Sequence, residues 1–150
     1  HVHVGGLGGA TVRSGDLLVS ALVAVNAFGS IDRTGLLVDR AVELGWPPAG
    51  SGGPGASFGD EAGSAGGATG ATGTNTTIGV IATNARLDRL GCLALAQGGH
   101  DGLARSIVPA HTRVDGDALF AVATGQVDAD VDHARLLALA AVERAVRSLA

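Results

Sequence analysis

Residues 75–84 have the sequence NTTIGVIATN, a short run rich in Thr and Ile that is bounded by Asn75 and Asn84. A β-branched run of this kind indicates a buried strand. The strand begins at Thr76, directly after a long segment of very different composition. This junction between a loop and a buried strand is the most informative feature of the sequence.

The segment before the junction, residues 47–74, consists mainly of Gly, Ala, Ser and Thr, with prolines near its start. It buries too little apolar surface to offset the entropy lost on ordering, so we expect a flexible connector. A structureless loop of this length is uncommon inside a compact domain. Its presence therefore calls for a functional explanation.

The residues before the connector favour strands. Residues 10–13 and 17–27 are expected to form a hairpin, because the second run is rich in Val, Leu and Ala and a polar turn joins the two. Residues 36–44 are compatible with either a strand or a short helix.

The residues after the connector favour helices around one further strand. We expect a helix over residues 86–97, stopped by the glycines at 98–99, and a shorter helix ending near Ile107. Residues 118–124 are typical of a strand. Residues 130–149 carry apolar side chains at helical spacing and predict a terminal helix. The chain is therefore expected to be a mixed α/β domain.

Composition limits the classes of function. The chain has 150 residues, enough for one domain with a core, a formal net charge of -4, and few aromatic residues. It offers neither a basic surface nor stacking platforms, so nucleic-acid binding is not expected. The sequence contains no apolar run long enough to span a membrane and no visible signal peptide. The single Cys92 requires no oxidising compartment, so we expect a cytoplasmic location and no membrane partner.

Two patterns could indicate a cofactor or a metal. Residues 2–9, VHVGGLGG, look superficially like a dinucleotide-binding loop, but such a loop needs a helix to begin at its glycines, whereas a strand pair is expected here. The five histidines lack the spacing of zinc ligands. Cys92 lies at a helical position where a small apolar core residue is the more ordinary interpretation. We therefore predict neither a cofactor nor a metal site.

The junction itself suggests a chemistry. A Thr can attack the carbonyl of the preceding residue through an N-to-O acyl shift, and hydrolysis of the resulting ester leaves that Thr with a free α-amino group. Such an amine has a pKa of about 7.7 to 8.0, so it can act as a base beside the hydroxyl without a His. Cleavage between Asn75 and Thr76 would thus create an N-terminal nucleophile. From composition alone, an ordinary strand entry rich in Thr explains the same residues.

The run over residues 75–84 resembles the cleavage segment of the self-processing peptidase family that includes the D-aminopeptidase/esterase DmpA, the β-peptidyl aminopeptidases and the nylon-oligomer hydrolase NylC. Other motifs occur in the family's order and at its spacing. They are GGLG at 5–8, AVNAFG at 24–29, HDGLAR at 100–105, PAHT at 109–112 and DGDALFAV at 115–122. The resemblance covers nearly the whole chain, and the motifs are specific as a set.

The resemblance implies roles for individual residues. Thr76 matches the nucleophile, a Thr as in the nylon-oligomer hydrolases, and Asn75 becomes the new C-terminus. Asn26 matches an active-site Asn whose amide can donate to an oxyanion, an interaction whose loss typically costs about 3 to 4 kcal/mol. Asp115 and Asp117 match carboxylates that orient the nucleophile and its amine. Without the family, these positions would be interpreted as ordinary turn residues.

The fold implied by the resemblance is an αββα sandwich of the DmpA and ornithine acetyltransferase type, in which helices cover two central sheets. Residues 1–150 would then be a single, partial catalytic domain that lacks its N-terminal part. Residues 1–75 would be a remnant of the larger subunit, including the connector, and residues 76–150 the smaller subunit after cleavage. Relatives assemble as oligomers of such pairs, so a homo-oligomer is expected.

One family feature has no counterpart in this sequence. Family members are roughly twice this length and carry an active-site Lys before or near the GGLG turn, where one branch has it at the position of Val4. The chain contains no Lys. Either an upstream portion supplies this residue or the site lacks it.

The resemblance predicts amide or peptide hydrolysis through an acyl-enzyme on Thr76, with peptides or linear amide oligomers as substrates. One alternative is acyl transfer of the ornithine acetyltransferase type, which also involves self-cleavage before a Thr but has a different surrounding sequence. Another alternative is a non-catalytic binding domain that keeps the fold without the chemistry. The absence of Lys is the feature that favours the second alternative.

Overall fold

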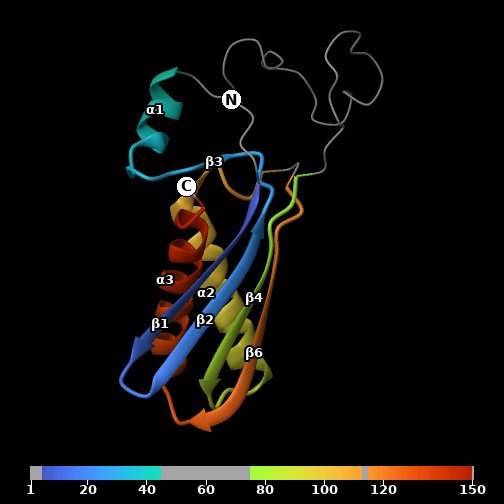
Figure 1. Ribbon diagram of the computed structural model, residues 1–150, viewed down its shortest axis with the longest axis vertical. Coiled ribbons are helices and arrows are strands. Elements are labelled where there is room, and N and C mark those ends of the chain that lie inside the picture. The colour runs from blue at the N-terminus through green and yellow to red at the C-terminus, as the bar shows by residue number, and fades with distance from the viewer. Residues whose placement is uncertain (1–4, 45–74, 113–114, 150) are drawn as a thin grey trace.

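The computed structural model describes residues 5–44, 75–112 and 115–149 (Figure 1). The elements in chain order are β1 (Gly6–Ser14), β2 (Leu17–Val25), β3 (Ser30–Ile31), α1 (Leu37–Leu44), β4 (Ile78–Ala85), α2 (Arg89–Ser106), β5 (Ile107–Val108), β6 (Ala118–Val127) and α3 (Val131–Arg147). The predicted mixed α/β class is confirmed. The connector at 47–74 and Val4 lie outside the described residues.

Four long strands form one sheet in the order β1, β2, β4, β6, and β3 pairs with β5 in a separate two-stranded sheet. The hairpin of β1 and β2 turns at Gly15, whose φ of +59° is a conformation that glycine adopts without strain. β2 pairs antiparallel with β4, whereas β4 pairs parallel with β6. Because parallel strands begin at the same edge of a sheet, the residues that precede β4 and β6 lie side by side.

The helices α2 and α3 pack together on one face of the four-stranded sheet (Figure 1). The terminal helix was predicted from its apolar spacing, and its buried side chains confirm that pattern. Its first turn is capped by Asp130, whose carboxylate accepts a hydrogen bond from the main-chain N–H of His133 at 2.9 Å. Completely buried side chains from the sheet and both helices meet between these layers, among them Val23, Ile81, Leu95, Leu103 and Val142.

Helix α2 is continuous from Arg89 to Ser106, so the expected break at residues 98–99 is wrong. The glycines serve close helix packing. A Cβ on Gly98 would lie 2.5 Å from the carbonyl oxygen of Arg135, and a Cβ on Gly102 would lie 2.5 Å from that of Leu139. Both oxygens belong to α3, so these glycines allow the two helices to approach each other closely.

The opposite face of the sheet is apolar and exposed. The strand register pairs Leu22 with Val80 and Val80 with Phe120, which places these side chains on one surface. They are 49%, 38% and 63% exposed, respectively. Large apolar patches of this kind on a sheet usually mark a surface that another element covers.

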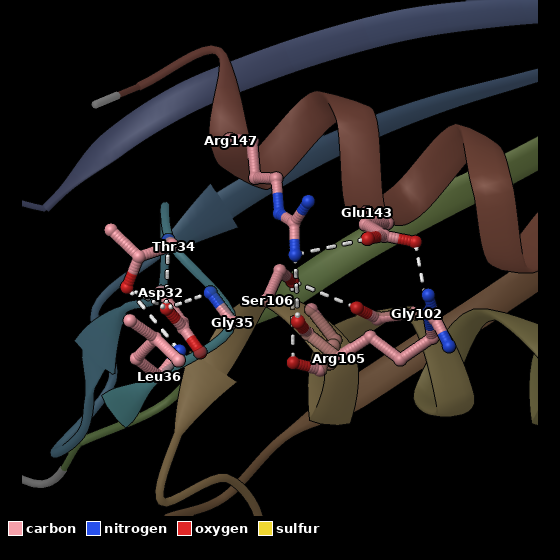
Figure 2. Close-up of polar contacts among 10 residues, drawn as sticks. Asp32, Thr34, Gly35, Leu36, Gly102, Arg105, Ser106, Glu143 and Arg147 are labelled. Carbon is pink, nitrogen blue, oxygen red and sulfur yellow. Dashed lines mark hydrogen bonds and ion pairs between the residues drawn. The ribbon is translucent and has the colours of Figure 1, made fainter. Parts of the chain in front are cut away.

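The connection from β3 to α1 is fixed by the buried carboxylate of Asp32 (Figure 2). Its Oδ1 accepts hydrogen bonds from the main-chain nitrogens of Thr34 at 3.0 Å and Gly35 at 2.8 Å, and its own N–H donates to the carbonyl of Ser106 at 2.8 Å. Burial raises the pKa of Asp32, but main-chain hydrogen bonds from Thr34, Gly35 and Leu37 outweigh burial. The pKa of Asp32 therefore lies below its ordinary value.

The lowered pKa makes the contribution of Asp32 to stability depend on pH. A carboxyl whose pKa is lower in the folded state stabilises the fold above its unfolded pKa, about 3.9, and this contribution is lost as the pH falls through the folded pKa. We expect Asp32→Asn to lower the free energy of unfolding by about 2 kcal/mol near neutral pH, because it weakens charge-assisted hydrogen bonds. Urea unfolding across pH should show this difference shrinking below about pH 4. A difference that is constant with pH would contradict the role of the charge.

A second polar cluster ties the end of α2 to α3 (Figure 2). Glu143 accepts from Arg105 Nε at 3.1 Å through one oxygen and pairs with Arg147 at 3.1 Å through the other. Arg147 also donates to the main-chain carbonyl of Arg105 at 3.2 Å. Exposed ion pairs contribute little individually, but the side chain of Glu143 is only 15% exposed and both of its oxygens are used. The cluster therefore fixes the helix end from which β5 and the 109–112 loop continue.

Candidate active site

The candidate active site lies at the sheet edge where β4 and β6 begin. Asn75 forms an isolated parallel bridge with Asp115. The main-chain N–H of Gly116 donates to the carbonyl of Asn75 at 2.8 Å, and that of Ala118 donates to the carbonyl of Thr77 at 2.9 Å. The parallel pairing thus extends beyond the strands and places the Asp-Gly-Asp sequence beside the predicted cleavage point.

The hydroxyl of Thr76 lies against the carbonyl group of the bond that is predicted to break. Its Oγ1 donates to the carbonyl oxygen of Asn75 at 2.6 Å. The same oxygen also accepts the hydrogen bond from Gly116. Both donors polarise the carbonyl, and the N–H of Gly116 stays available to the negative charge that develops on the oxygen when a nucleophile adds to the carbon. The hydroxyl of Thr76, the carbonyl of Asn75 and a main-chain donor to that carbonyl therefore lie together.

Gly116 was not predicted as a site residue. A Cβ at this position would lie 2.9 Å from Thr76 Oγ1, closer than real Cβ atoms approach other heavy atoms. With any other residue here, either the Thr76 hydroxyl or the loop that donates to Asn75 would have to move. The signal in the sequence was a glycine between two acidic residues, which is also ordinary turn chemistry.

Asn26 follows the end of β2 and contacts the predicted nucleophile. Its main-chain carbonyl accepts a hydrogen bond from the N–H of Thr76 at 2.8 Å. The structure therefore brings Asn26 and Thr76 together through the main chain. The predicted role of the Asn26 side-chain amide as a donor to an oxyanion stays a prediction.

Asp115 joins two loops that border the site. Its Oδ1 accepts from the N–H of Phe28 at 3.0 Å, and its Oδ2 accepts from the N–H and the hydroxyl of Thr112 at 3.0 and 2.5 Å. Phe28 lies two residues after Asn26, whose carbonyl binds Thr76. Asp115 therefore fixes the segment whose carbonyl binds the nitrogen of Thr76, and its predicted role in orienting a nucleophile stays a prediction.

Asp117 binds the main chain directly after Thr76, the predicted nucleophile. Its Oδ1 accepts from the N–H of Thr77 at 2.8 Å, and its Oδ2 lies 2.8 Å from Nδ1 of His111. The Asp117 side chain is only 5% exposed. In the sequence, His111 was only one of five histidines that lack the spacing of zinc ligands, and its place in the site was missed because it depends on the turn made by the 109–112 loop.

A second histidine lies next to His111. The ring centroids of His100 and His111 are 5.0 Å apart. Burial lowers the pKa of His100, and the nearby charge of His111 lowers it further, which outweighs the opposing effects of Asp117 and Asp101. His100 therefore favours its neutral form more strongly than an exposed histidine does.

Within residues 5–44, 75–112 and 115–149, no group of three His, Cys, Asp or Glu side chains is arranged to hold a metal ion. Over the same described ranges, no helix is long and apolar enough to cross a membrane. Cys92, predicted to be a small core residue, is partly buried on α2.

Comparison with known proteins identifies relatives over most of the chain. The chain is 41% identical over 138 residues to an uncharacterized aminopeptidase of Mycobacterium leprae, covering 83% of this chain and 34% of the relative. It is 35% identical over 124 residues to a 6-aminohexanoate-oligomer endohydrolase of an Agromyces species, covering 82% of this chain and 34% of the relative. The chain thus spans about a third of the length of these curated relatives.

Solved structures share the fold. A protein from Pyrococcus horikoshii matches with a TM-score of 0.61 at 21% identity, over 95% of this chain and 38% of the other. A beta-aminopeptidase of a Burkholderia species matches with a TM-score of 0.57 at 23% identity, over 95% of this chain and 40% of the other. A model of peptidase family S58 matches residues 1–149. The resemblance found in the sequence is confirmed, and the chain belongs to peptidase family S58.

Proposed function

We propose that this chain is a self-processing amide or peptide hydrolase that cuts itself between Asn75 and Thr76 and then uses Thr76 as its nucleophile. The observation that carries the proposal is the 2.6 Å hydrogen bond from the Thr76 hydroxyl to the carbonyl oxygen of Asn75. Membership in peptidase family S58 supports the hydrolytic class.

Self-cleavage begins with attack of Thr76 Oγ1 on the carbonyl carbon of Asn75. A new carbon–oxygen bond forms, the carbon–nitrogen bond of the peptide breaks, and the hydroxyl proton passes to the departing nitrogen. The N–H of Gly116 stabilises the negative charge on the Asn75 oxygen in the tetrahedral intermediate. Water then hydrolyses the ester, which leaves a carboxylate on Asn75 and a free amine on Thr76.

The contacts that hold the intact chain also suit the cleaved form. The nitrogen of Thr76 lies 2.8 Å from the carbonyl oxygen of Asn26, which accepts equally well from an amide or an ammonium. An α-amine with a pKa of about 7.7 to 8.0 can take the proton of its own hydroxyl near neutral pH. Attack on a substrate amide then gives an acyl-enzyme ester on Thr76 and releases an amine, and water releases the acid.

The relatives and the surface support the wider proposal. One relative is named as an aminopeptidase and another as a 6-aminohexanoate-oligomer endohydrolase, which favours peptides or linear amides as substrates. The exposed apolar sheet face around Leu22, Val80 and Phe120 favours the αββα sandwich, because a second sheet packed on it would remove it from water. The division into subunits 1–75 and 76–150, their assembly as a homo-oligomer of cleaved pairs, and a cytoplasmic location are parts of the same proposal.

The intact mass of the purified protein tests this proposal. The wild type, expressed with any natural sequence that flanks the chain, should give two fragments, one ending at Asn75 and one starting at Thr76. Thr76→Ala should remain whole, because a methyl group cannot attack the carbonyl. Thr76→Ser keeps a hydroxyl and serves as the matched control, which should still be cut. A single uncut mass for the wild type would contradict the proposal.

A further inference from the structure

We infer that His111 is a positioning residue for the cleavage reaction: it holds the carboxylate of Asp117, which in turn holds the main chain next to the nucleophile. The inference rests on the proposed function and deepens it, since it assigns a role to a residue that contacts neither Thr76 nor the bond that breaks. Its basis is a chain of contacts that links a partly exposed ring to the first residues after the cut.

The chain of contacts is short and uses both carboxylate oxygens. His111 Nδ1 lies 2.8 Å from Asp117 Oδ2, and Asp117 Oδ1 accepts from the N–H of Thr77 at 2.8 Å. An ionised carboxylate only accepts hydrogen bonds, so Nδ1 is the donor. Asp117 is almost completely buried, and a buried carboxylate is costly unless donors satisfy it. Among the described residues, His111 provides the donor for one oxygen and Thr77 the donor for the other.

The main chain at His111 is held in an unusual conformation. Its φ is +55°, in the left-handed region that residues other than glycine seldom adopt, although His, Asn and Asp are enriched there. This conformation has a cost that the surrounding contacts must offset. His111 is also the residue whose ring reaches Asp117. We therefore infer that the function of the left-handed turn is to direct this ring toward Asp117.

The ring also lies close to α2. His111 Nε2 lies 3.4 Å from the carbonyl oxygen of His100, and the rings of the two residues are neighbours. The PAHT motif therefore lies beside the HDGLAR motif and contacts the Asp-Gly-Asp sequence through Nδ1 of His111. His111 is the residue that joins these three motifs.

Removal of the His111 donor should slow self-cleavage. It leaves Asp117 Oδ2 without its donor, so the carboxylate turns, and the N–H of Thr77 loses its fixed acceptor. The hydroxyl of the adjacent Thr76 then no longer rests against the carbonyl of Asn75. Misplacement of a reacting group by about 1 Å can reduce a rate by about 100-fold. We expect a reduction of about 10- to 100-fold.

The variants His111→Asn and His111→Gly separate the donor from the turn. Both residues accept a left-handed conformation, but only the Asn amide places a donor near the position of Nδ1. The fraction of cut chain is followed over time after pulse labelling in cell-free translation. His111→Asn should cut within about 3-fold of the wild-type rate, and His111→Gly should cut at least about 10-fold more slowly. Equal rates for the two variants would overturn the inference.

A further variant covers the case in which His111→Gly fails to fold. In His111→Asp, the new side chain is as large as that in His111→Asn and tolerates the turn equally well. It presents an acceptor to Asp117 in place of a donor. A slow Asp variant beside a fast Asn variant supports the inference, and equally fast variants overturn it. If the wild type itself stays uncut, the proposed function fails and the inference fails with it. If the wild type is cut and the variants do not differ, the inference alone fails.

Discussion

Replacement of Gly116 by Ala is expected to slow cleavage between Asn75 and Thr76 by at least about 100-fold. The added Cβ would lie 2.9 Å from Thr76 Oγ1, so either the hydroxyl or the loop must move. The N–H of Gly116 is also the main-chain donor to the Asn75 carbonyl, and loss of one such donor typically costs about 100- to 1,000-fold in rate. Pulse labelling in cell-free translation, with the cut fraction followed over time, measures this effect.

The matched control is Gly9→Ala in β1. A Cβ on Gly9 would lie 3.6 Å from a side-chain carbon of Leu22 and 3.7 Å from the carbonyl oxygen of Ala21, both ordinary contacts. This variant should be cut at the wild-type rate. Neither Gly9 nor Gly116 has a left-handed φ, so Ala strains the main chain at neither position. Wild-type cleavage by Gly116→Ala would show that Thr76 attacks from a direction other than the one seen here.

The elements that could be predicted from the sequence are those with a local signal. The terminal helix follows from apolar spacing, and the hairpin and the strand after Thr76 follow from runs of β-branched and aliphatic residues. The site has no such local signal. Asn75 and Asp115 are 40 positions apart and meet only because β4 pairs parallel with β6, a long-range choice that periodicity does not encode. The resemblance to a family supplied these residues, and composition alone would have left them in turns.

Two features could be predicted neither from local sequence patterns nor from the family resemblance, and the reason in each case is physical. The donor at Gly116 is a main-chain N–H, which every residue except proline possesses, so the residue type does not indicate it. The role of His111 depends on a left-handed turn that brings its ring to Asp117.

The glycines in α2 were misinterpreted because glycine marks both helix ends and close contacts between helices. Gly98 and Gly102 are four residues apart and share one helix face, which was the available signal for a contact.

Gly102→Ala, at the contact between α2 and α3, is expected to lower the free energy of unfolding by about 3 kcal/mol. Helix propensity alone predicts the opposite sign, because Ala in a helix is favoured over Gly by about 1 kcal/mol. The new Cβ would lie 2.5 Å from the carbonyl oxygen of Leu139 and 3.2 Å from the nitrogen of Glu143. Both atoms belong to the main chain of α3, so they cannot move unless the helix moves. Overpacking of this kind typically costs about 1 to 3 kcal/mol, and a rigid backbone neighbour places this site at the upper end.

Gly91→Ala, in the first turn of the same helix, is the matched control. A Cβ on Gly91 would lie 3.1 Å from the Cβ of Leu87 and 3.4 Å from Oδ1 of Asp88, and Leu87 lies in the loop before the helix, where a small shift relieves the contact. Urea unfolding should therefore show Gly91→Ala to be as stable as the wild type or more stable by up to about 1 kcal/mol. If Gly102→Ala were also stabilised, α2 would not need glycine to approach α3. Since α2 leads through β5 to the loop of His111, a destabilised Gly102→Ala should also lose cleavage as the site loses its support, whereas Gly91→Ala should keep it.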